Sequence, residues 1–268
     1  MPRAGTLGNP NPYTFFGTFA GLPFWPGGLS LLAAAPGIGK TSWMIRMVYE
    51  ASANGFPSAL GCYEHTPEEL KYRLRLQAEA IVSGAHNSAG EAAVETCLAR
   101  GSEAVLLSLS DKEDTVRALE DTLLQDYGFP QKGPALLAVD YLNRVPVVGL
   151  TGMLNDASRG GEAAAMLREL SRRHGWAVIA AAALRSEDFR EGDELSALLG
   201  DERVPYEADR VLLMRRSKDV ERCGCVALAV HTLKDRTGPA RTWEMTFWGA
   251  RFYPAFENES HRHGVYSG

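Results

Sequence analysis

Short apolar runs alternate with segments of helical periodicity from residue 29 to residue 182. Each run has the length of a strand, and turn residues separate it from the next segment. The runs that predict strands are 29–34, 57–63, 104–109, 134–140 and 176–182, and helices are expected over 42–48, from 67 onward, over 111–127 and over 161–175. This alternation predicts an α/β fold with a mostly parallel sheet flanked by helices on both faces.

The helix expected from residue 67 has a clear start signal. Thr66 and Glu69 have the spacing of a capping box, and Pro67 suits the first helical position. Leu70 and Leu74 then share one face of the helix. The segment is therefore expected to pack one side against the sheet.

The pattern changes after residue 182. Three apolar runs, 211–214, 226–233 and 242–247, are joined by short turns, which predicts a late antiparallel extension at the edge of the sheet. Residues 1–26 contain five prolines among aromatic residues, and the last residues are polar. The expected organisation is an N-terminal arm over 1–26, one folded domain over 27–256 and a polar tail over 257–268.

Composition narrows the class of protein. A chain of 268 residues with 45% hydrophobic content can bury one substantial core, and its net charge of −5 gives no overall attraction for nucleic acid. The cysteines are few and include no C-x-x-C pair, and no segment has the pattern of a signal peptide or a membrane span. These features predict a cytoplasmic protein, and the cysteines are Cys62, Cys97, Cys223 and Cys225.

The turn between the first strand and its helix carries the most informative motif. Its Gly39-Lys40-Thr41 step completes the pattern G-x-x-x-x-G-K-[ST], although Ala34 stands at the first glycine position. In such a loop the backbone N–H groups surround phosphates, the lysine reaches the β and γ groups, and the hydroxyl binds Mg²⁺. The motif therefore predicts binding of ATP and Mg²⁺. The residues expected to contact the nucleotide are Ala35, Pro36, Gly37, Ile38, Gly39, Lys40, Thr41 and Ser42.

Two carboxylates follow predicted strands and suit the chemistry of a triphosphatase. Asp140 ends an apolar run and is expected to support Mg²⁺ together with Thr41. Glu64 directly follows the strand after the loop helix and is expected to activate the attacking water. The alternatives are that Asp140 only caps a turn and that Glu64 is a solvated loop acid.

Several motifs, taken in order, resemble the RecA-like ATPase domain of DnaB-type replicative helicases. The resemblance extends from about residue 16 to about residue 252. The matching segments are Gly37–Thr41, Tyr63–Pro67, Val139–Leu142, Glu207–Val211 and Lys234–Pro239. The resemblance implies a RecA-like fold and a hexameric ring that binds ATP at its subunit interfaces.

The resemblance also implies roles for individual residues. Lys40 and Thr41 would bind phosphate and Mg²⁺, Asp140 would support the metal, and Glu64 would activate water. Two further catalytic residues, Lys234 and Arg236, would reach the γ-phosphate bound by the adjacent subunit. Cations two positions apart on one strand face can also converge on one anion for purely geometric reasons. The alternative for them is a charged strand edge that discourages aggregation.

The sequence departs from the family pattern in three places. Ala183 stands where the family commonly has a polar residue that senses the γ-phosphate. The loop over 185–203, expected to face nucleic acid, holds seven acidic residues against three arginines, which disfavours a phosphate backbone. Arg144 and Arg159 near the other central loop could compensate. The N-terminal helical domain of replicative helicases has no counterpart in the sequence.

Other candidates are weaker. The His261-Arg262-His263 segment has no acidic or cysteine partner nearby, so a polar tail explains it better than a metal site. Aromatic residues in the late strands could stack on bases, but their alternation favours a core or interface role. They are Trp243, Phe247, Trp248, Phe252 and Tyr253.

The sequence thus predicts an ATPase that forms a hexameric ring or filament and acts on single-stranded DNA as a helicase or translocase. The alternative is a RecA/KaiC-type switch or scaffold that assembles with a protein partner, which Ala183 and the acidic loop favour. A structural protein with a degenerate site is a further alternative. Intact Lys40, Thr41, Glu64 and Asp140 argue against it.

Overall fold

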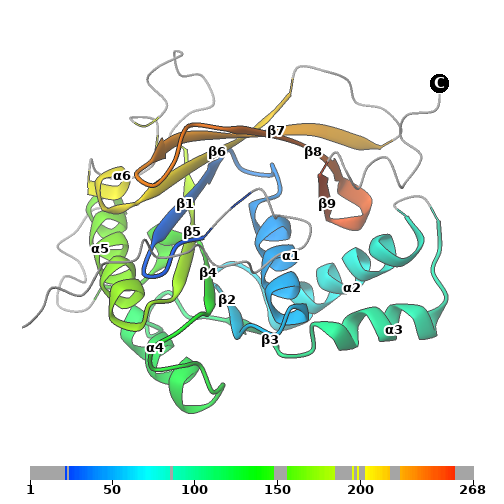
Figure 1. The fold of residues 1–268 in the computed structure, drawn as a ribbon, viewed down its shortest axis with the longest axis horizontal. Coiled ribbons are helices and arrows are strands. Elements are labelled where there is room, and N and C mark those ends of the chain that lie inside the picture. Colours follow the sequence, from blue (N-terminus) through cyan, green and yellow to red (C-terminus); the bar gives the residue numbers. More distant parts are fainter. Residues whose placement is uncertain are drawn as a thin grey trace, which may run out of the picture.

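Helices and strands alternate through the described part of the chain, as Figure 1 shows. The computed structural model describes residues 22, 24–84, 87–147, 156–184, 195, 198, 203–217 and 224–256. The strands are β1 (Leu29–Ala34), β2 (Ser58–Cys62), β3 (Ala104–Ser108), β4 (Leu136–Asp140), β5 (Ala177–Ala183), β6 (Arg210–Arg216), β7 (Cys225–Asp235), β8 (Thr242–Trp248) and β9 (Tyr253–Phe256). The helices are α1 (Lys40–Ala53), α2 (Pro67–Ser83), α3 (Glu91–Arg100), α4 (Val116–Gln125), α5 (Asp156–His174) and α6 (Arg203–Glu207), with 3-10 turns η1 (Leu142–Arg144) and η2 (Gly249–Arg251).

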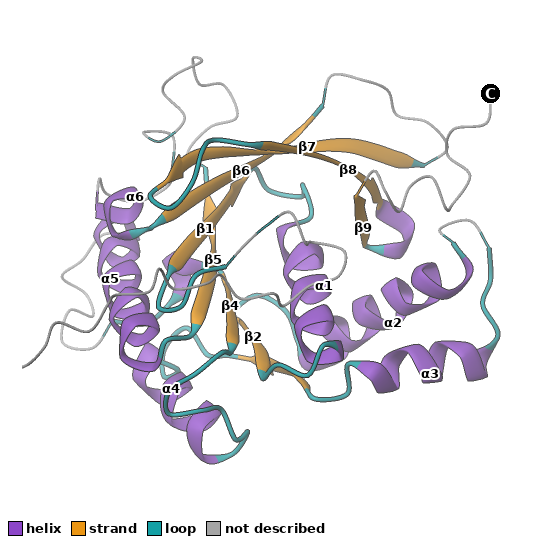
Figure 2. Cartoon of the chain, in the orientation of Figure 1, coloured by secondary structure: helices purple, strands orange, loops and turns teal. Residues whose placement is uncertain are grey.

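The strands of these ranges form one nine-stranded sheet in the order β3-β2-β4-β5-β1-β6-β7-β8-β9. Neighbours from β3 to β6 pair in parallel, whereas β7, β8 and β9 extend the sheet in antiparallel fashion. Figure 2 shows this extension as long strands that run across the end of the parallel part. The expected α/β fold, with a mostly parallel sheet and a late antiparallel extension, is confirmed.

Successive strand residues point to opposite faces of the sheet and so build two cores. Leu32 and Ile179 join the cluster around α1, whereas Leu31 and Val178 join the cluster around α4 and α5. Figure 1 shows α1, α2 and α3 on one side of the sheet and α4 and α5 on the other. Because helices cover both faces, the parallel strands are apolar throughout and read as continuous runs in the sequence.

Local signals explain where two helices begin. The capping box of α2 is confirmed: the Thr66 hydroxyl accepts from the Glu69 N–H at 3.3 Å, and the Glu69 carboxylate accepts from the Thr66 N–H at 2.9 Å. The helix expected over 111–127 is shorter than predicted. Helix α4 begins after Thr115, whose hydroxyl accepts from the Ala118 N–H, because Asp114 instead holds a turn by accepting from the Ser110 N–H.

Three elements carry too weak a pattern to have been predicted. Helix α3 buries only Val94 and Cys97, so its apolar periodicity is faint. Helix α6 is a single short turn. Strand β9 pairs with β8 although Pro254 lies within it, and a proline in a strand argues against the assignment unless the strand lies at an edge.

Some sequence-based expectations fall outside the described residues. Of the arm over 1–26, the structure describes residues 22 and 24–26, and Leu22 and Phe24 are buried in the core. The tail over 257–268 and Cys223 lie outside the described ranges. So does most of the acidic loop over 185–203.

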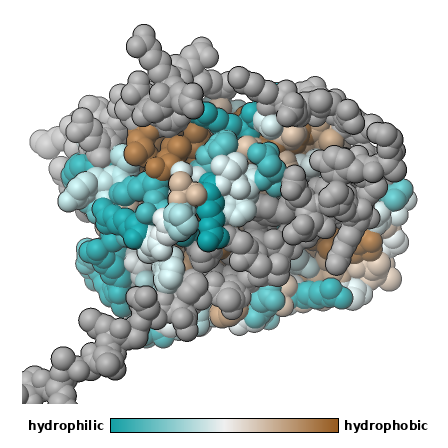
Figure 3. Space-filling model, turned by 45° about the horizontal axis from the view of Figure 1, so that its top comes forward, coloured by the Kyte–Doolittle hydropathy of each residue, from teal (hydrophilic) through white to brown (hydrophobic). Residues whose placement is uncertain are grey.

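The described surface offers little continuous apolar area. On the face in Figure 3, brown residues form separate patches among teal and white ones. No helix among the described residues is long and apolar enough to cross a membrane. The exposed large apolar or aromatic residues in the described ranges are Tyr72, Val82, Tyr127, Leu195 and Tyr206.

Candidate nucleotide-binding site

The carboxyl ends of the central parallel strands meet at one edge of the sheet. The register pairs Ala34 with Ala183 and Cys62 with Asp140, so the segments that follow β1, β2 and β4 open onto the same place. A cavity of about 570 Å³ lies there. Its lining residues are Pro36, Gly37, Gly39, Lys40, Thr41, Ser42, Glu64, His65, Arg73, Asp140, Tyr141, Ala183, Phe247, Gly249 and Phe252.

The loop between β1 and α1 has the backbone that an anion-binding loop needs. Gly37 has φ 77° and Gly39 has φ 108°, both in the left-handed region that glycine adopts without strain. A Cβ at Gly39 would also approach the Phe247 ring at 3.1 Å. Ala34, by contrast, lies in the extended strand β1, which any residue can adopt. This position therefore has no need of the first glycine of the motif.

Lys40 is the first residue of α1, and its side chain bonds back to the loop that precedes the helix. Its ammonium donates to the Ala34 carbonyl at 2.9 Å and to the Ala35 carbonyl at 3.2 Å. Burial lowers the pKa of Lys40, while the nearby Asp140 and Glu64 carboxylates oppose that shift. Helix α1 begins beside this cation without a side-chain cap at Gly39, so the N–H groups of its first turn and a positive charge face the same cavity.

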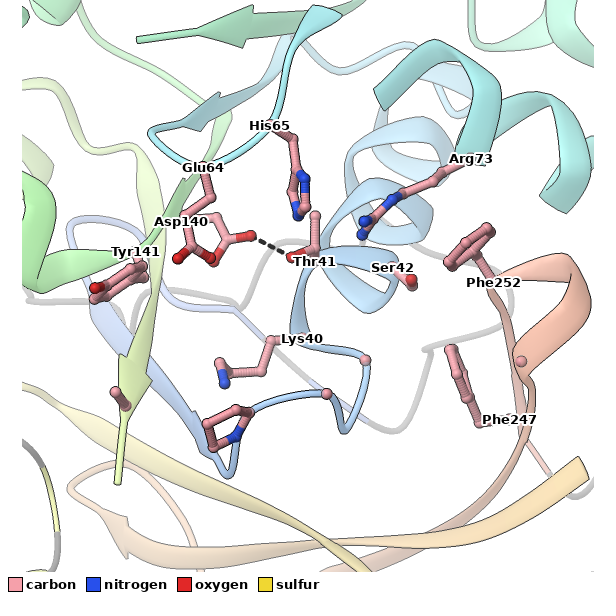
Figure 4. Close-up of a pocket in the computed structure, with 15 residues that line it drawn as sticks. Lys40, Thr41, Ser42, Glu64, His65, Arg73, Asp140, Tyr141, Phe247 and Phe252 are labelled. Atoms are coloured by element: carbon pink, nitrogen blue, oxygen red, sulfur yellow. Dashed lines mark hydrogen bonds between the residues drawn. The ribbon is translucent and has the colours of Figure 1, made fainter. Parts of the chain in front are cut away.

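Thr41 and Asp140 are joined directly. The Thr41 hydroxyl donates to Asp140 Oδ2 at 2.5 Å, as the dashed line in Figure 4 shows. Asp140 is 1% exposed, and this burial raises the pKa of its carboxyl, although the Thr41 hydrogen bond and Lys40 oppose the shift. This contact joins the end of β4 to the start of α1, and the role of Asp140 as a metal ligand stays a prediction.

A hydroxyl and a carboxylate in contact are hard oxygen donors of the kind that Mg²⁺ prefers. Within the described ranges, no group of three or more histidine, cysteine, aspartate or glutamate side chains could hold a metal ion. Mg²⁺ usually binds through one or two protein groups, with phosphate oxygens and water completing its shell. Thr41 and Asp140 therefore fit this cation in the company of a nucleotide.

Glu64 lies on the same side of the cavity as Asp140. It follows β2 in the loop before α2, and Figure 4 shows Glu64 and His65 beside the Thr41–Asp140 pair. Unlike Asp140, Glu64 is exposed. It can therefore meet a water molecule that enters the cavity from solvent.

The opposite wall of the cavity contains residues that the sequence did not single out as ligands. Phe247 comes from β8, Phe252 follows η2, and Arg73 comes from α2. The Arg73 guanidinium lies 4.8 Å from the centroid of the Phe252 ring. Figure 4 shows both phenylalanines across the loop from Asp140. This wall offers flat apolar faces suited to a nucleotide base.

Two of the late aromatic residues, Trp248 and Tyr253, have the core role that their sequence pattern favours. Trp248 and Tyr253 are 2% and 1% exposed, so they belong to the core. Phe247 and Phe252 differ because each is half-buried and faces the cavity. Spacing along the chain gives no signal for that difference, since the wall forms where Arg73 on α2 meets a segment far along the chain.

Lys234 and Arg236 are not part of this cavity. The Lys234 ammonium donates to the carbonyls of Pro205 at 2.6 Å and Ala208 at 2.7 Å, and Arg236 donates to the Tyr206 carbonyl at 2.9 Å. Both cations thus converge on α6. Burial lowers the pKa of Lys234, and the neighbouring Arg236 acts in the same direction. Lys234 pairs with Val211 on β6, whereas the pairing of β7 with β8 ends at His231, so the strand-edge alternative stays open.

A buried strand, a glycine loop, a lysine at a helix start and a carboxylate on a neighbouring strand define a P-loop nucleotide-binding protein with a RecA-like fold. The chain belongs to the family described as the DnaB-like helicase C-terminal domain, whose model matches residues 19–258. A direct comparison with curated protein sequences found no match.

Two solved structures have the same fold. One is an ATPase domain with 19% sequence identity and a TM-score of 0.69, and the match covers 87% of this chain and 86% of that one. The other is a DnaB-like replicative helicase described with its interactions with primase, with 20% identity and a TM-score of 0.70. That match covers 87% of this chain and 59% of the helicase chain.

Proposed function

We propose that the chain binds and hydrolyses ATP with Mg²⁺ and acts on DNA as an oligomeric helicase or translocase. The observation that carries the proposal is the Thr41–Asp140 hydrogen bond beside Lys40 in one cavity. This arrangement brings a cation, a hydroxyl and a carboxylate to the start of one helix, which supports binding of phosphate and Mg²⁺ there. Membership of the helicase family supports the choice of DNA as the polymer.

Each residue has a defined task in this proposal. Lys40 and the α1 N-terminus hold the β- and γ-phosphates, and Thr41 and Asp140 hold Mg²⁺. The metal, when bound, offsets negative charge that develops on the phosphate oxygens. Glu64 takes a proton from the attacking water, and its exposure leaves the proton free to leave to solvent.

Arg236 and Lys234 would complete the site of a neighbouring subunit. Both cations lie outside the cavity of their own chain, and the Arg236 side chain is 42% exposed. A cation supplied across an interface makes hydrolysis depend on assembly. The proposal therefore includes a homo-oligomeric ring, which we place in the cytoplasm, with single-stranded DNA as its ligand.

Calorimetry with ATP and Mg²⁺ tests the nucleotide part of the proposal. Lys40→Ala is expected to abolish measurable binding, because the cation that neutralises the phosphates is lost. Glu64→Gln is expected to keep ATP bound while hydrolysis falls by about 10²-fold or more, since only the carboxylate accepts a proton. Unchanged ATP affinity in a folded Lys40→Ala protein would remove the loop from nucleotide binding.

One observation favours a second candidate function. Ala183 lines the cavity at the end of β5, where a polar side chain could sense the γ-phosphate. Without such a group, ATP would control assembly with a protein partner rather than movement on DNA. Weak, salt-sensitive binding of single-stranded DNA, with little stimulation of hydrolysis, would support this switch or scaffold. Tight, salt-resistant binding with strongly stimulated turnover would support the helicase.

A further inference from the structure

Gln77 lies in the interior of α2 and joins two walls of the nucleotide cavity. It is 0% exposed. Its side-chain amide donates to the Ser42 carbonyl at 2.8 Å and to the Phe252 carbonyl at 2.7 Å. Ser42 belongs to the first turn of α1, and Phe252 belongs to the aromatic wall. One buried side chain therefore fixes the aromatic wall relative to the phosphate-binding helix.

The backbone of Phe252 needs such support. Its φ is 49°, and Phe252 is the one residue other than glycine in the described ranges with a positive φ. A side chain as bulky as phenylalanine rarely adopts this left-handed conformation unless its surroundings hold it there. The hydrogen bond from Gln77 to the Phe252 carbonyl supplies one such constraint.

A second constraint comes from the same face of α2. Arg73 precedes Gln77 by four residues, so the two side chains lie one above the other on the helix. Arg73 lies against the Phe252 ring at 4.8 Å, while Gln77 holds the Phe252 backbone. An ion pair between Arg251 and Glu79 fixes the neighbouring turn η2 to the same helix. Helix α2 thus holds both the ring and the peptide of Phe252.

We propose that Gln77 is a positioning residue that sets the affinity of the cavity for the nucleotide base by holding Phe252 in place. The inference rests on the proposed binding of ATP. Gln77 meets the phosphate-binding helix only at the Ser42 backbone carbonyl among the described residues, whereas it holds the aromatic wall at Phe252, so its loss is expected to weaken binding of the base and to spare the triphosphate. A displaced Phe252 ring would lose its stacking contact with the base.

The amide is suited to this task because both of its partners are carbonyl oxygens. A glutamine offers two N–H donors on one nitrogen, whereas methionine offers none, and an ionised glutamate would present acceptors to acceptors. The Gln77 amide oxygen is buried and has no hydrogen-bond partner among the described residues. Folding therefore costs Gln77 the hydrogen bond that its amide oxygen makes to water, while its amide nitrogen donates the two hydrogen bonds that join the cavity walls.

The test compares two ligands, MgATP and inorganic tripolyphosphate with Mg²⁺, in calorimetry on the full chain. Gln77→Met is expected to weaken ATP binding by about 10-fold, as for loss of a base–aromatic stack, and to leave the affinity for tripolyphosphate unchanged. Phe252→Ala is expected to do the same. The double variant is expected to bind ATP no more weakly than Phe252→Ala alone, because both changes remove the same contact, that of the Phe252 ring with the base.

Val94→Ala is the matched control, since Val94 is buried in α3, which packs on α2, and is not among the cavity residues. Val94→Ala should lower the thermal stability by about as much as Gln77→Met and leave the affinities for ATP and tripolyphosphate unchanged. Equal weakening of both ligands by Gln77→Met, no weakening of ATP, or additive effects in the double variant would overturn the inference. A wild-type chain that binds neither ligand would instead contradict the proposed function. Circular dichroism on each variant verifies its fold.

Discussion

Two buried carboxylates, Asp140 and Glu120, differ in the hydrogen-bond partners that offset the burial of their charge. Asp140 stands at the end of β4 in the cavity and accepts one side-chain hydrogen bond among the described residues, from Thr41. Glu120 lies in α4, where it accepts from Arg173 at 2.8 and 3.0 Å and contacts His174 Nε2 at 2.6 Å. They differ little in burial, at 1% and 7% exposed, but greatly in their partners.

The ionisation of the two groups follows from these partners. Burial raises the pKa of Asp140, and the Thr41 hydrogen bond does not offset that effect. Burial also raises the pKa of Glu120, but the hydrogen bonds from His174 and Arg173 outweigh it, so the pKa of Glu120 is lowered. The comparison teaches that Glu120 is a structural acid satisfied by its own chain. Asp140 is a buried acid whose charge opposes folding and which is suited to a cation from solution, in line with the proposed role beside Mg²⁺.

Asp140→Asn gives the largest separation between these two roles. Hydrolysis is expected to fall by about 10³-fold, because the amide is a poor Mg²⁺ ligand and the metal contributes several kcal/mol of charge stabilisation. The nucleotide-free protein is expected to become more stable by ~1 kcal/mol at neutral pH, since a buried charge is removed. Initial-rate assays and thermal unfolding measure the two effects. A lower unfolding temperature would show that ionised Asp140 supports the fold.

The contrast extends to cations, since Arg173 serves its own chain and Arg236 would serve a neighbour. Arg236→Ala is expected to keep ATP affinity and to lower hydrolysis by about 10³-fold, as for loss of a finger supplied across an interface. Mixing Arg236→Ala with Lys40→Ala subunits should restore part of the activity, because some interfaces then combine an intact loop with an intact arginine. A mixture whose activity equals the sum of its two components would contradict the shared site.

The sequence predicted the cation and carboxylate part of the site because each residue follows a strand or lies in a contiguous motif. The rule that the carboxyl ends of parallel strands meet at one edge of a sheet was enough to predict that four residues lie together, namely Lys40, Thr41, Glu64 and Asp140. That rule also placed Ala183 beside the loop.

The aromatic wall could not be predicted in the same way. Arg73 and Phe252 are far apart in sequence, and their contact depends on how η2 packs against α2. The pair of Glu120 and His174 has the same difficulty, since two helices must pack before the side chains meet. Lys234 shows a third limit: the cation was predicted, but its three backbone acceptors, two on α6 and one at Ala208 just after it, were not.

Glu120→Gln tests the structural half of the comparison. The free energy of unfolding is expected to fall by about 3 kcal/mol, because the amide cannot pair with Arg173 and leaves the buried His174 contact weakened. ATP affinity should not change, since Glu120 lies outside the cavity. Glu169→Gln is the control: it removes the exposed partner of Arg173, and a surface pair of this kind is worth at most about 1 kcal/mol. Equal losses of unfolding free energy in the two variants would show that Glu120 contributes no more to the fold than an exposed acid.

The pH dependence of stability gives the smallest effect and separates the two acids by sign. The lowered pKa of Glu120 means that the unfolded chain binds this proton more tightly than the folded chain, so its stabilisation is complete above the ordinary pKa of 4.5 and declines as pH falls below it. The raised pKa of Asp140 has the opposite sign, and stability is lost as pH rises from the ordinary value of 3.8 through the folded one. In denaturant titrations, the gap in unfolding free energy between wild type and Glu120→Gln should therefore narrow as pH falls below 4.5. The gap between Asp140→Asn and wild type should open as pH rises from 4. Parallel gaps at every pH would show that neither carboxylate changes its ionisation on folding.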